Sequence, residues 1–254
     1  MARYLLEVAY DGTAFHGSQV QGDTPTVQLA LNRALSVLLR KETITVGASR
    51  TDEGVHALES YFHFDHEEPL HLHFRYKMNA ILPGTVTVKR VLLAHDPEFN
   101  ARFAALSRRY RYRIYHQKDP FLQNRALYYP FRIDMEMLRE TAAVLKEYTD
   151  FESFSKRNTQ TFTFNCNILD SHWEQHGAEL HYVVEANRFL RGMVRGLVGT
   201  QLKIAGGKRP MDDFRRIIEA KDCRQAYFNV PGHGLYLEHI AYPADSFTEV
   251  EDQR

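Results

Sequence analysis

The sequence predicts an α+β fold, in which two related α/β lobes surround a mostly antiparallel central sheet with a cleft between them. Strand-like runs alternate with amphipathic helical segments along the chain, and each half contains both in a similar order. A chain of 254 residues that is 44% hydrophobic can form one large domain or two closely packed lobes. No linker rich in Pro or Ser marks a boundary, so we predict lobes of residues 1–103 and 104–254.

The first half alternates strands with helices. Residues 3–10 form the first strand, which Asp11-Gly12 ends, and a helix follows Thr24-Pro25-Thr26. The apolar residues of this helix recur at helical spacing: Val27, Leu31, Ala34, Leu35 and Leu38. We expect further strands at residues 43–48, 58–64 and 85–93, and a helix over residues 73–82 that stops at Pro83-Gly84.

The second half repeats this alternation. Strands are expected at residues 107–115, 165–175, 180–185 and 235–241, with a hairpin turn at His176-Gly177. Asp134 is placed to cap a helix that runs to residue 148. Another helix spans residues 188–204 and ends at Gly206-Gly207, and a short one follows Pro210.

Composition narrows the class of protein. Lys+Arg and Asp+Glu are both 32, so any surface that binds nucleic acid must be local. Cys166 and Cys223 match no metal-ligand spacing and do not make a disulfide framework. No apolar run approaches the roughly 20 residues that span a membrane, and the N-terminus lacks a signal-peptide pattern. We therefore expect a cytoplasmic protein without membrane contact.

The carboxylate of Asp52 is the leading candidate for chemistry. Asp52 lies within Arg50-Thr51-Asp52-Glu53-Gly54-Val55-His56-Ala57, between two expected strands. A charged group on a loop held by a sheet is a frequent arrangement at functional sites. The chain has no Cys-x-x-Cys, no phosphate-binding glycine loop and no Gly-x-Ser-x-Gly.

The strand at residues 107–115 alternates arginine with tyrosine. Alternate side chains of a strand point to opposite faces, so Arg109, Arg111 and Arg113 share one face, and Tyr110 and Tyr112 lie on the other. Guanidinium groups for phosphates and rings for stacking on bases are typical of a nucleic-acid surface. A half-buried strand with a solvated arginine face explains the same pattern.

The predicted helix over residues 188–204 contains arginines and glycines together. At about 100° per residue, Arg188, Arg191 and Arg195 fall on one side, together with glycines that lower helix stability by about 1 kcal/mol each. Glycines that lower the stability of a helix indicate that another backbone or a substrate lies close to the helix at these positions. An inward-facing arginine needs a carboxylate, and we expect Asp52 to pair with Arg195.

The histidines do not form a convincing metal site. His63, His66, His71 and His73 lie close together in the sequence, but they lack a fixed ligand spacing with Cys or carboxylates. We predict no metal, while a metal-dependent hydrolase remains an alternative class to test.

Together these segments resemble the TruA-type tRNA pseudouridine synthases, and the resemblance spans nearly the whole chain. Residues 50–57 are similar to the family's catalytic motif, in which Gly usually stands at Ser49 and Ala at Glu53. The other matching segments are residues 15–21, 97–103, 109–112, 187–195 and 234–237. Their joint order and spacing are more specific than any one of them. The segment 158–165 lacks the arginine that the family usually has there.

The resemblance implies an enzyme, an isomerase that converts uridine to pseudouridine at positions 38, 39 and 40 of the tRNA anticodon stem-loop. It implies no metal or organic cofactor and a homodimer. Asp52 would be the nucleophile, Tyr110 would stack on the target base and Arg195 would pair with Asp52. Arg50 would fill the space left by the flipped nucleotide.

Further substrate contacts are expected from Gln19, Leu235, Arg109 and Arg111. The residue chemistry is compatible with the implied reaction, because a carboxylate can attack C1′ of the ribose, assist elimination at C2′ or add to C6 of the base. An arginine close to Asp52 would keep that carboxylate ionised, and Glu53 is expected to point outward. A phenol such as Tyr110 can accept or relay the C5 proton. The residue pattern alone also allows a non-catalytic RNA-binding module.

Overall fold

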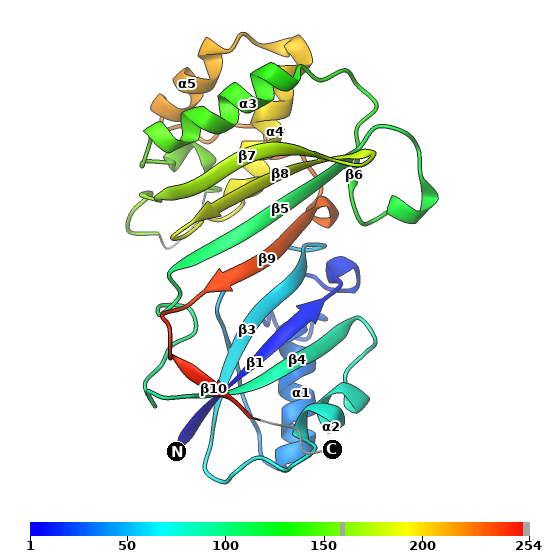
Figure 1. Cartoon of the computed structure of the whole chain (residues 1–254), viewed down its shortest axis with the longest axis vertical. Helices are drawn as coiled ribbons and strands as arrows, with labels where there is room; N and C mark the ends of the chain where they lie inside the picture. Colours follow the sequence, from blue (N-terminus) through cyan, green and yellow to red (C-terminus); the bar gives the residue numbers. More distant parts are fainter. Residues whose placement is uncertain (158–160, 251–254) are drawn as a thin grey trace. The chain divides into compact units, whose positions relative to one another are not determined.

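A computed structural model describes residues 1–157 and 161–250. As predicted, the protein is a mixed α+β protein with a large, mostly antiparallel sheet of ten strands (Figure 1). Its contacts divide the chain into two compact units: unit 1 is Met1–Leu106 with the residues from Leu237 onward, and unit 2 is Ser107–Tyr236. The assignment of lobes to residues 1–103 and 104–254 stays a prediction.

Unit 1 is built around a central strand. β1 (Ala2–Tyr10) pairs antiparallel with β3 (His56–His66) on one side and with β4 (Val86–Ala94) on the other. The short strands β2 (Val46–Gly47) and β10 (Phe247–Glu249) pair with β3 and β4. The helices α1 (Val27–Leu39) and α2 (Phe74–Ile81) pack against each other, and α2 packs against β4. All these elements except β10 overlap expected segments, although β1, β3 and β4 extend beyond the predicted bounds by one or two residues.

The core of unit 1 lies between this sheet and its helices. Leu6 of β1 and Leu31 and Leu35 of α1 are fully buried, as expected from the helical spacing of the α1 residues. Thr26 caps α1, because its Oγ1 accepts a hydrogen bond from the backbone N–H of Leu29 at 3.3 Å.

Unit 2 places its helices on one side of a three-stranded core. β5 (Ser107–Tyr115), β8 (Glu179–Ala186) and β7 (Ile168–His176) form antiparallel neighbours, and β6 (Leu127–Tyr128) pairs parallel with β5. The helices are α3 (Met135–Val144), α4 (Met193–Lys203) and α5 (Asp212–Glu219), and Asp134 caps α3 as predicted. β9 (Leu235–Ala241) contains the point in the sequence where unit 2 ends and unit 1 resumes.

Short helical turns complete the chain. They are η1 (Gly12–Ala14), η2 (Pro120–Leu122), η3 (Leu145–Glu147), η4 (Glu152–Phe154), η6 (Gly232–Gly234) and the π-helical turn η5 (Ile204–Lys208). The predicted helix from Asp134 to residue 148 is therefore α3 followed by η3.

Helix α4 is the buried centre of unit 2. Trp173 of β7 donates from Nε1 to Oε1 of Gln201 at 2.8 Å, and Thr141 of α3 donates to the same oxygen at 3.2 Å. The α4 glycines allow close packing, as expected: a Cβ at Gly199 would lie 2.0 Å from the carbonyl oxygen of Tyr227. These contacts join α4 to the sheet, to α3 and to the following segment.

Two predictions about secondary structure are wrong. The expected strand at residues 43–48 is reduced to β2, because the backbone N–H groups of Thr43 and Thr45 donate to side chains of α1 instead of to a strand. The helix expected from residue 188 begins only at Met193, because Gly192 adopts a left-handed conformation with φ +73°. Arg188 and Arg191 therefore precede α4, and they do not share a helical face with Arg195.

The contact at Gly199 predicts a large loss of stability on Gly199→Ala. The new methyl group cannot coexist with the Tyr227 carbonyl unless α4 moves, so the free energy of unfolding should fall by more than about 2 kcal/mol. Gly84→Ala is the matched control, because a Cβ there meets nothing within 4 Å. Urea denaturation of both variants measures the difference, and equal stabilities would contradict this description of the core.

Candidate functional site

The loop that carries Asp52 is held by the segment after β1. The N–H of Thr51 donates to Oγ of the buried Ser18 at 2.9 Å, and the N–H of Ser18 donates to the Thr51 carbonyl at 3.1 Å. The hydroxyl groups of Tyr10 and Thr51 lie 2.9 Å apart in the interior. Asp52 itself is half-buried. The residue before the candidate nucleophile is thus fixed through both its backbone and its side chain.

Glycines make this close approach possible. Gly17 has φ +96°, and a Cβ there would lie 2.8 Å from the carbonyl oxygen of Thr51. A Cβ at Gly12 would lie 2.0 Å from the carbonyl oxygen of Val55. The N–H of Gly12 also donates to Nδ1 of the buried His56 at 3.1 Å. One short segment, residues 12–18, therefore supports the loop although it lies far from it in sequence.

The charged neighbours of Asp52 in the loop, Arg50 and Glu53, are both exposed. The Glu53 carboxylate is 72% exposed and lies 3.4 Å from Nδ1 of His16, which confirms that Glu53 points outward. Arg50 is exposed and Gln19 is half-buried, and both line a cavity of about 280 Å³ in unit 1. The structure thus brings Arg50 and Gln19 together beside the Asp52 loop.

The other candidate residues lie in unit 2. The ring of Tyr110 is buried and packs edge-on against Phe189, with ring centroids 5.1 Å apart. Arg195 lies in the first turn of α4 and donates from Nε to the carbonyl of Val230 at 2.8 Å. Leu235 is buried at the start of β9. Because Asp52 belongs to unit 1, its pairing with Arg195 and its position relative to Tyr110 stay predictions.

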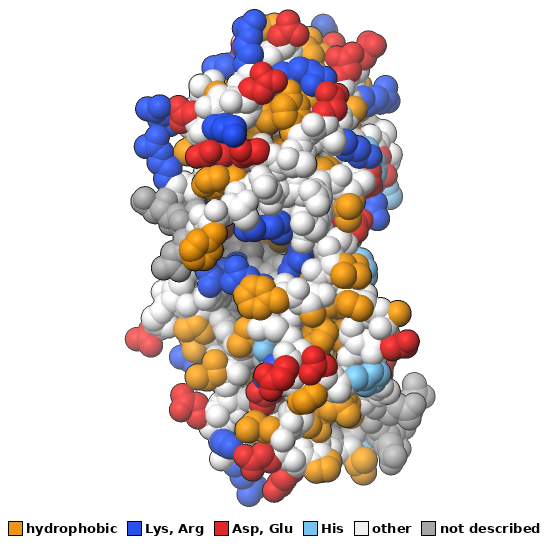
Figure 2. Space-filling model, turned by 90° about the vertical axis from the view of Figure 1, so that its left-hand side faces the viewer, with side chains coloured by type: hydrophobic (Ala, Val, Ile, Leu, Met, Phe, Trp, Pro, Cys, Tyr) orange, Lys and Arg blue, Asp and Glu red, His pale blue; other side chains and the backbone are white. Residues whose placement is uncertain are grey.

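The strand β5 alternates as predicted, with Tyr110 and Tyr112 buried and Arg109, Arg111 and Arg113 on the opposite face. These arginines pair with carboxylates of β7 and β8: Arg109 with Asp170 at 3.4 Å, Arg111 with Glu174 at 3.6 Å and Arg113 with Glu179 at 2.7 Å. Figure 2 shows acidic and basic side chains interspersed over unit 2 on the face in view. The arginine face is therefore part of an ion-pair network, a feature that the pattern of β5 alone did not predict.

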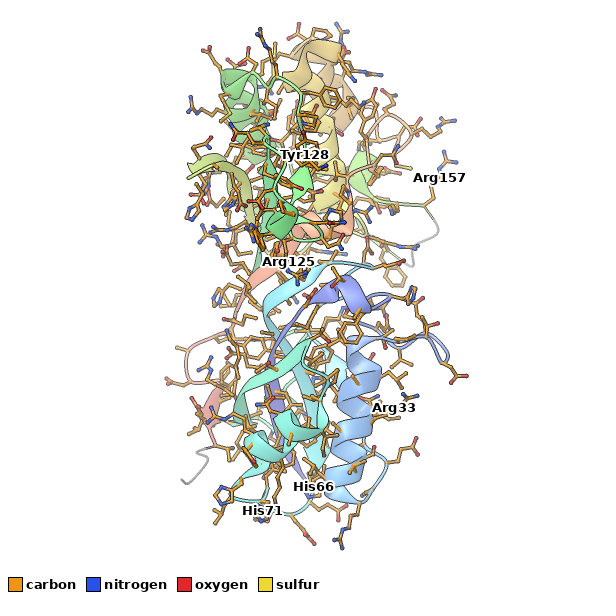
Figure 3. The ribbon with its side chains drawn as sticks, turned by 90° about the vertical axis from the view of Figure 1, so that its right-hand side faces the viewer. Arg33, His66, His71, Arg125, Tyr128 and Arg157 are labelled. Carbon is orange, nitrogen blue, oxygen red and sulfur yellow. The ribbon has the colours of Figure 1, made fainter. Side chains whose placement is uncertain are left out.

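The four histidines between residues 63 and 73 lie in unit 1, and one of them is buried. His63 is buried on β3, where its Nδ1 accepts from the N–H of Ala101 at 3.4 Å. Figure 3 shows His66 and His71 at the same end of unit 1, and the rings of His71 and His73 lie 5.8 Å apart. Among the described residues, no group of three or more His, Cys, Asp or Glu side chains is placed to hold a metal ion.

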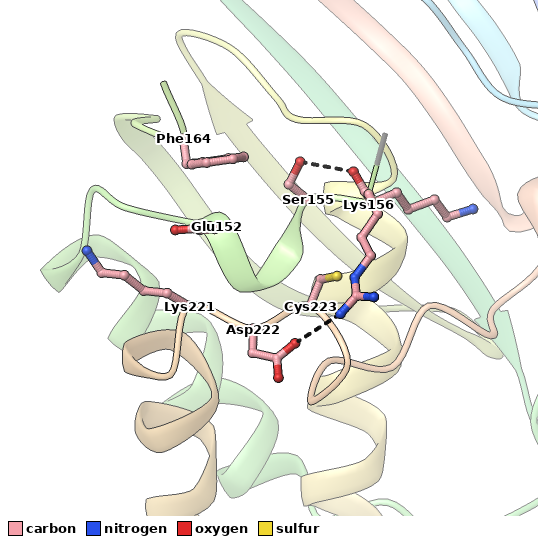
Figure 4. A pocket seen from close by; sticks show the side chains of 8 residues that line it. Glu152, Ser155, Lys156, Phe164, Lys221, Asp222 and Cys223 are labelled. Carbon is pink, nitrogen blue, oxygen red and sulfur yellow. Dashed lines mark hydrogen bonds and ion pairs between the residues drawn. The ribbon is translucent and has the colours of Figure 1, made fainter. Parts of the chain in front are cut away.

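A second cavity, of about 400 Å³, lies in unit 2 (Figure 4). Lys156, Arg157 and Lys221 line it together with acidic residues, and Arg157 lies 4.0 Å from Asp222. None of the predicted site residues contributes to it. Of the segment that lacks the family's arginine, residues 158–160 lie outside the described residues, while Phe162 is fully exposed and Phe164 lines this cavity.

Cys166 and Cys223 are free thiols, and burial raises the pKa of Cys166 to about 11. Within residues 1–157 and 161–250, no helix has the length and apolar character needed to cross a bilayer.

Comparison with known proteins agrees with the resemblance of the motifs. The family described as tRNA pseudouridine synthase matches residues 148–243. Proteins named tRNA pseudouridine synthase A are similar over nearly their whole length: that of Parabacteroides distasonis is 42% identical over 99% of this chain and 100% of its own. That of Bacillus subtilis is 38% identical over 94% of this chain and 99% of its own. The chain belongs to the TruA family of tRNA pseudouridine synthases.

The Ser18–Thr51 contact predicts a specific loss on Ser18→Ala. Removing the hydroxyl leaves the N–H of Thr51 without its acceptor in a buried position, which costs about 1–3 kcal/mol. We expect a lower free energy of unfolding and a lower kcat for pseudouridine formation, because the Asp52 loop loses an anchor. Ser18→Thr retains the hydroxyl and should restore part of both. Unchanged stability and kcat in Ser18→Ala would contradict this role.

The buried His63 predicts a pH dependence of stability. Burial, and then the charge of Arg3, lower the pKa of His63 below its usual value of 6.5. The folded state then binds a proton less readily than the unfolded state, so stability is fully present above about pH 6.5 and is lost as pH falls. Unfolding in urea at about pH 7.5 and about pH 5.5 should show a smaller difference for His63→Gln than for the wild type. Equal differences would contradict the assignment.

Proposed function

We propose that the protein isomerises uridine to pseudouridine at positions 38, 39 and 40 of the tRNA anticodon stem-loop, with Asp52 as the nucleophile. Family membership makes it a pseudouridine synthase, which is an intramolecular isomerase. The observation that carries the residue assignment is the support of the Asp52 loop. The hydrogen bonds between Ser18 and Thr51 fix the backbone immediately before the carboxylate.

The reaction moves uracil from an N1 to a C5 attachment on the same ribose. The N1–C1′ bond breaks, the detached base turns, C5 bonds to C1′, and the C5 proton leaves while N1 gains one, so no oxidant or second substrate is needed. Asp52 assists by attack at C1′, by elimination at C2′ or by addition to C6 of the base. Each route needs an ionised carboxylate, and an arginine partner favours that form.

Tyr110 and Arg195 complete the proposed catalytic set. Tyr110 would stack on the target base and accept or relay the C5 proton, and the edge-on contact with Phe189 would hold its ring in place. Arg195 would pair with Asp52, and its hydrogen bond to the Val230 carbonyl would orient the guanidinium. This arrangement requires a cleft between the two lobes, which we propose as the place where the extruded uridine binds.

The proposed RNA contacts follow from exposure and charge. Arg50 is exposed and would fill the space left by the flipped nucleotide, while Gln19 and Leu235 would contact the RNA nearby. Arg109 and Arg111 would reach phosphates by exchanging Asp170 and Glu174 for RNA oxygens. Extruding a base costs a few kcal/mol, which such contacts must offset.

We also propose a homodimer in the cytoplasm that needs no metal or organic cofactor. Because the net charge is zero, a second copy would help to assemble a positive groove for tRNA from local patches. The free thiols of Cys166 and Cys223 suit a reducing compartment, where tRNA is found.

Asp52→Asn should abolish pseudouridine formation. The amide is a poor nucleophile and carries no charge, so the rate should fall by at least about a thousandfold, as for other nucleophile replacements. Glu53→Gln is the matched control, because its carboxylate is exposed and points away. The assay is proton release from C5-tritiated uridine in a tRNA transcript, with thermal unfolding as the test of folding. Retained activity in a folded Asp52→Asn would overturn the mechanism.

A further inference from the structure

Residues 43–46 expose their apolar side chains and bury their polar ones. Ile44 is 66% exposed and Val46 is 43% exposed, whereas Thr43 and Thr45 are 8% and 0% exposed. A strand-like segment beside a core normally shows the reverse order. Exposed apolar residues next to buried polar ones are informative, because hydrophobic burial alone would turn the segment over.

A ladder of polar side chains on α1 fixes this orientation. Gln28, Asn32 and Ser36 are four residues apart and so share one face of the helix. The N–H of Thr43 donates to Ser36 Oγ at 3.0 Å. The N–H and Oγ1 of Thr45 donate to Asn32 Oδ1 at 2.9 and 2.8 Å, and Gln28 Nε2 donates to the Thr45 carbonyl. Turning the segment over would break these bonds, so Ile44 and Val46 stay outward.

The exposed pair forms an apolar wall next to the catalytic loop. Ile44 and Val46 line the cavity of about 280 Å³ that Arg50 and Gln19 also line. The buried ring of Phe62 contributes to the lining as well, and Gly47 lies so close to it that a Cβ would be 3.0 Å from the ring. The cavity thus combines an apolar wall with the exposed guanidinium of Arg50, a residue that lies two positions before Asp52 in the sequence.

We propose that this cavity binds a nucleotide of the RNA substrate that neighbours the target uridine, with its base against Ile44 and Val46. The inference rests on the proposed function, because it places RNA beside Asp52. A nucleotide joins a flat apolar face to an anionic phosphate, and single-stranded loops offer such unstacked bases. The apolar wall suits the base, Arg50 suits the phosphate, and the amide of Gln19 suits a base edge.

The test replaces the apolar wall without disturbing the polar ladder. Ile44→Thr with Val46→Thr keeps the β-branched shape and removes apolar surface at exposed positions. Val37→Thr is the matched control, because Val37 is 65% exposed in the same unit but does not line the cavity. Filter binding gives the Kd for an anticodon stem-loop RNA, kinetics give kcat and KM, and sedimentation gives the oligomeric state.

We expect the double variant to bind the RNA about tenfold more weakly, because the base loses apolar contact with both side chains. KM should carry most of the loss, and Val37→Thr should match the wild type. Unchanged affinity in an active protein would overturn this inference alone. Loss of self-association with unchanged RNA affinity per folded chain would also overturn it and assign the wall to a second copy. A wild type that forms no pseudouridine would overturn the proposed function instead.

Discussion

The paired hydrogen bonds between Ser18 and Thr51 are the constraint on which the candidate site depends. They join the segment after β1 to the loop before β3, and β1 and β3 are themselves antiparallel neighbours in the sheet. A loop of this kind is otherwise free to move, and a nucleophile on a mobile loop loses the advantage of correct orientation. The buried hydroxyl of Ser18 and the carbonyl of Thr51 thus connect the Asp52 loop to the segment that follows β1 and hold it in place.

In unit 2, close packing of α4, hydrogen bonds and ion pairs hold the elements together. Its glycines let α4 touch neighbouring groups, and the Gln201 amide oxygen accepts from both Trp173 and Thr141. Its arginine face is neutralised by carboxylates of adjacent strands, which explains how an arginine-rich strand fits a chain without net charge. RNA binding at Arg109 and Arg111 would then be an exchange of anionic partners, and such binding should weaken steeply with salt.

Sequence patterns revealed those features that are determined locally. The alternation of β5, the start of α1 after Thr26, the Asp134 cap and the outward Glu53 each follow from a few neighbouring residues, and the structure confirms them. Features set by distant partners were not accessible. No periodicity in the sequence shows that Asn32 of α1 accepts a hydrogen bond from the backbone N–H of Thr45, or that Asp170 forms an ion pair with Arg109. The start of α4 was predicted too early. A glycine in a sequence does not show whether its backbone is helical or left-handed, and Gly192 is left-handed.

We propose above all that Asp52, on its supported loop, carries out pseudouridine formation in the anticodon arm. The most direct measurement treats an unmodified tRNA transcript with the purified protein and maps pseudouridine along the whole chain by carbodiimide labelling and primer extension. We expect new stops at positions 38, 39 and 40 wherever the transcript has uridine there. A transcript without pseudouridine, or with pseudouridine only outside the anticodon arm, would contradict it.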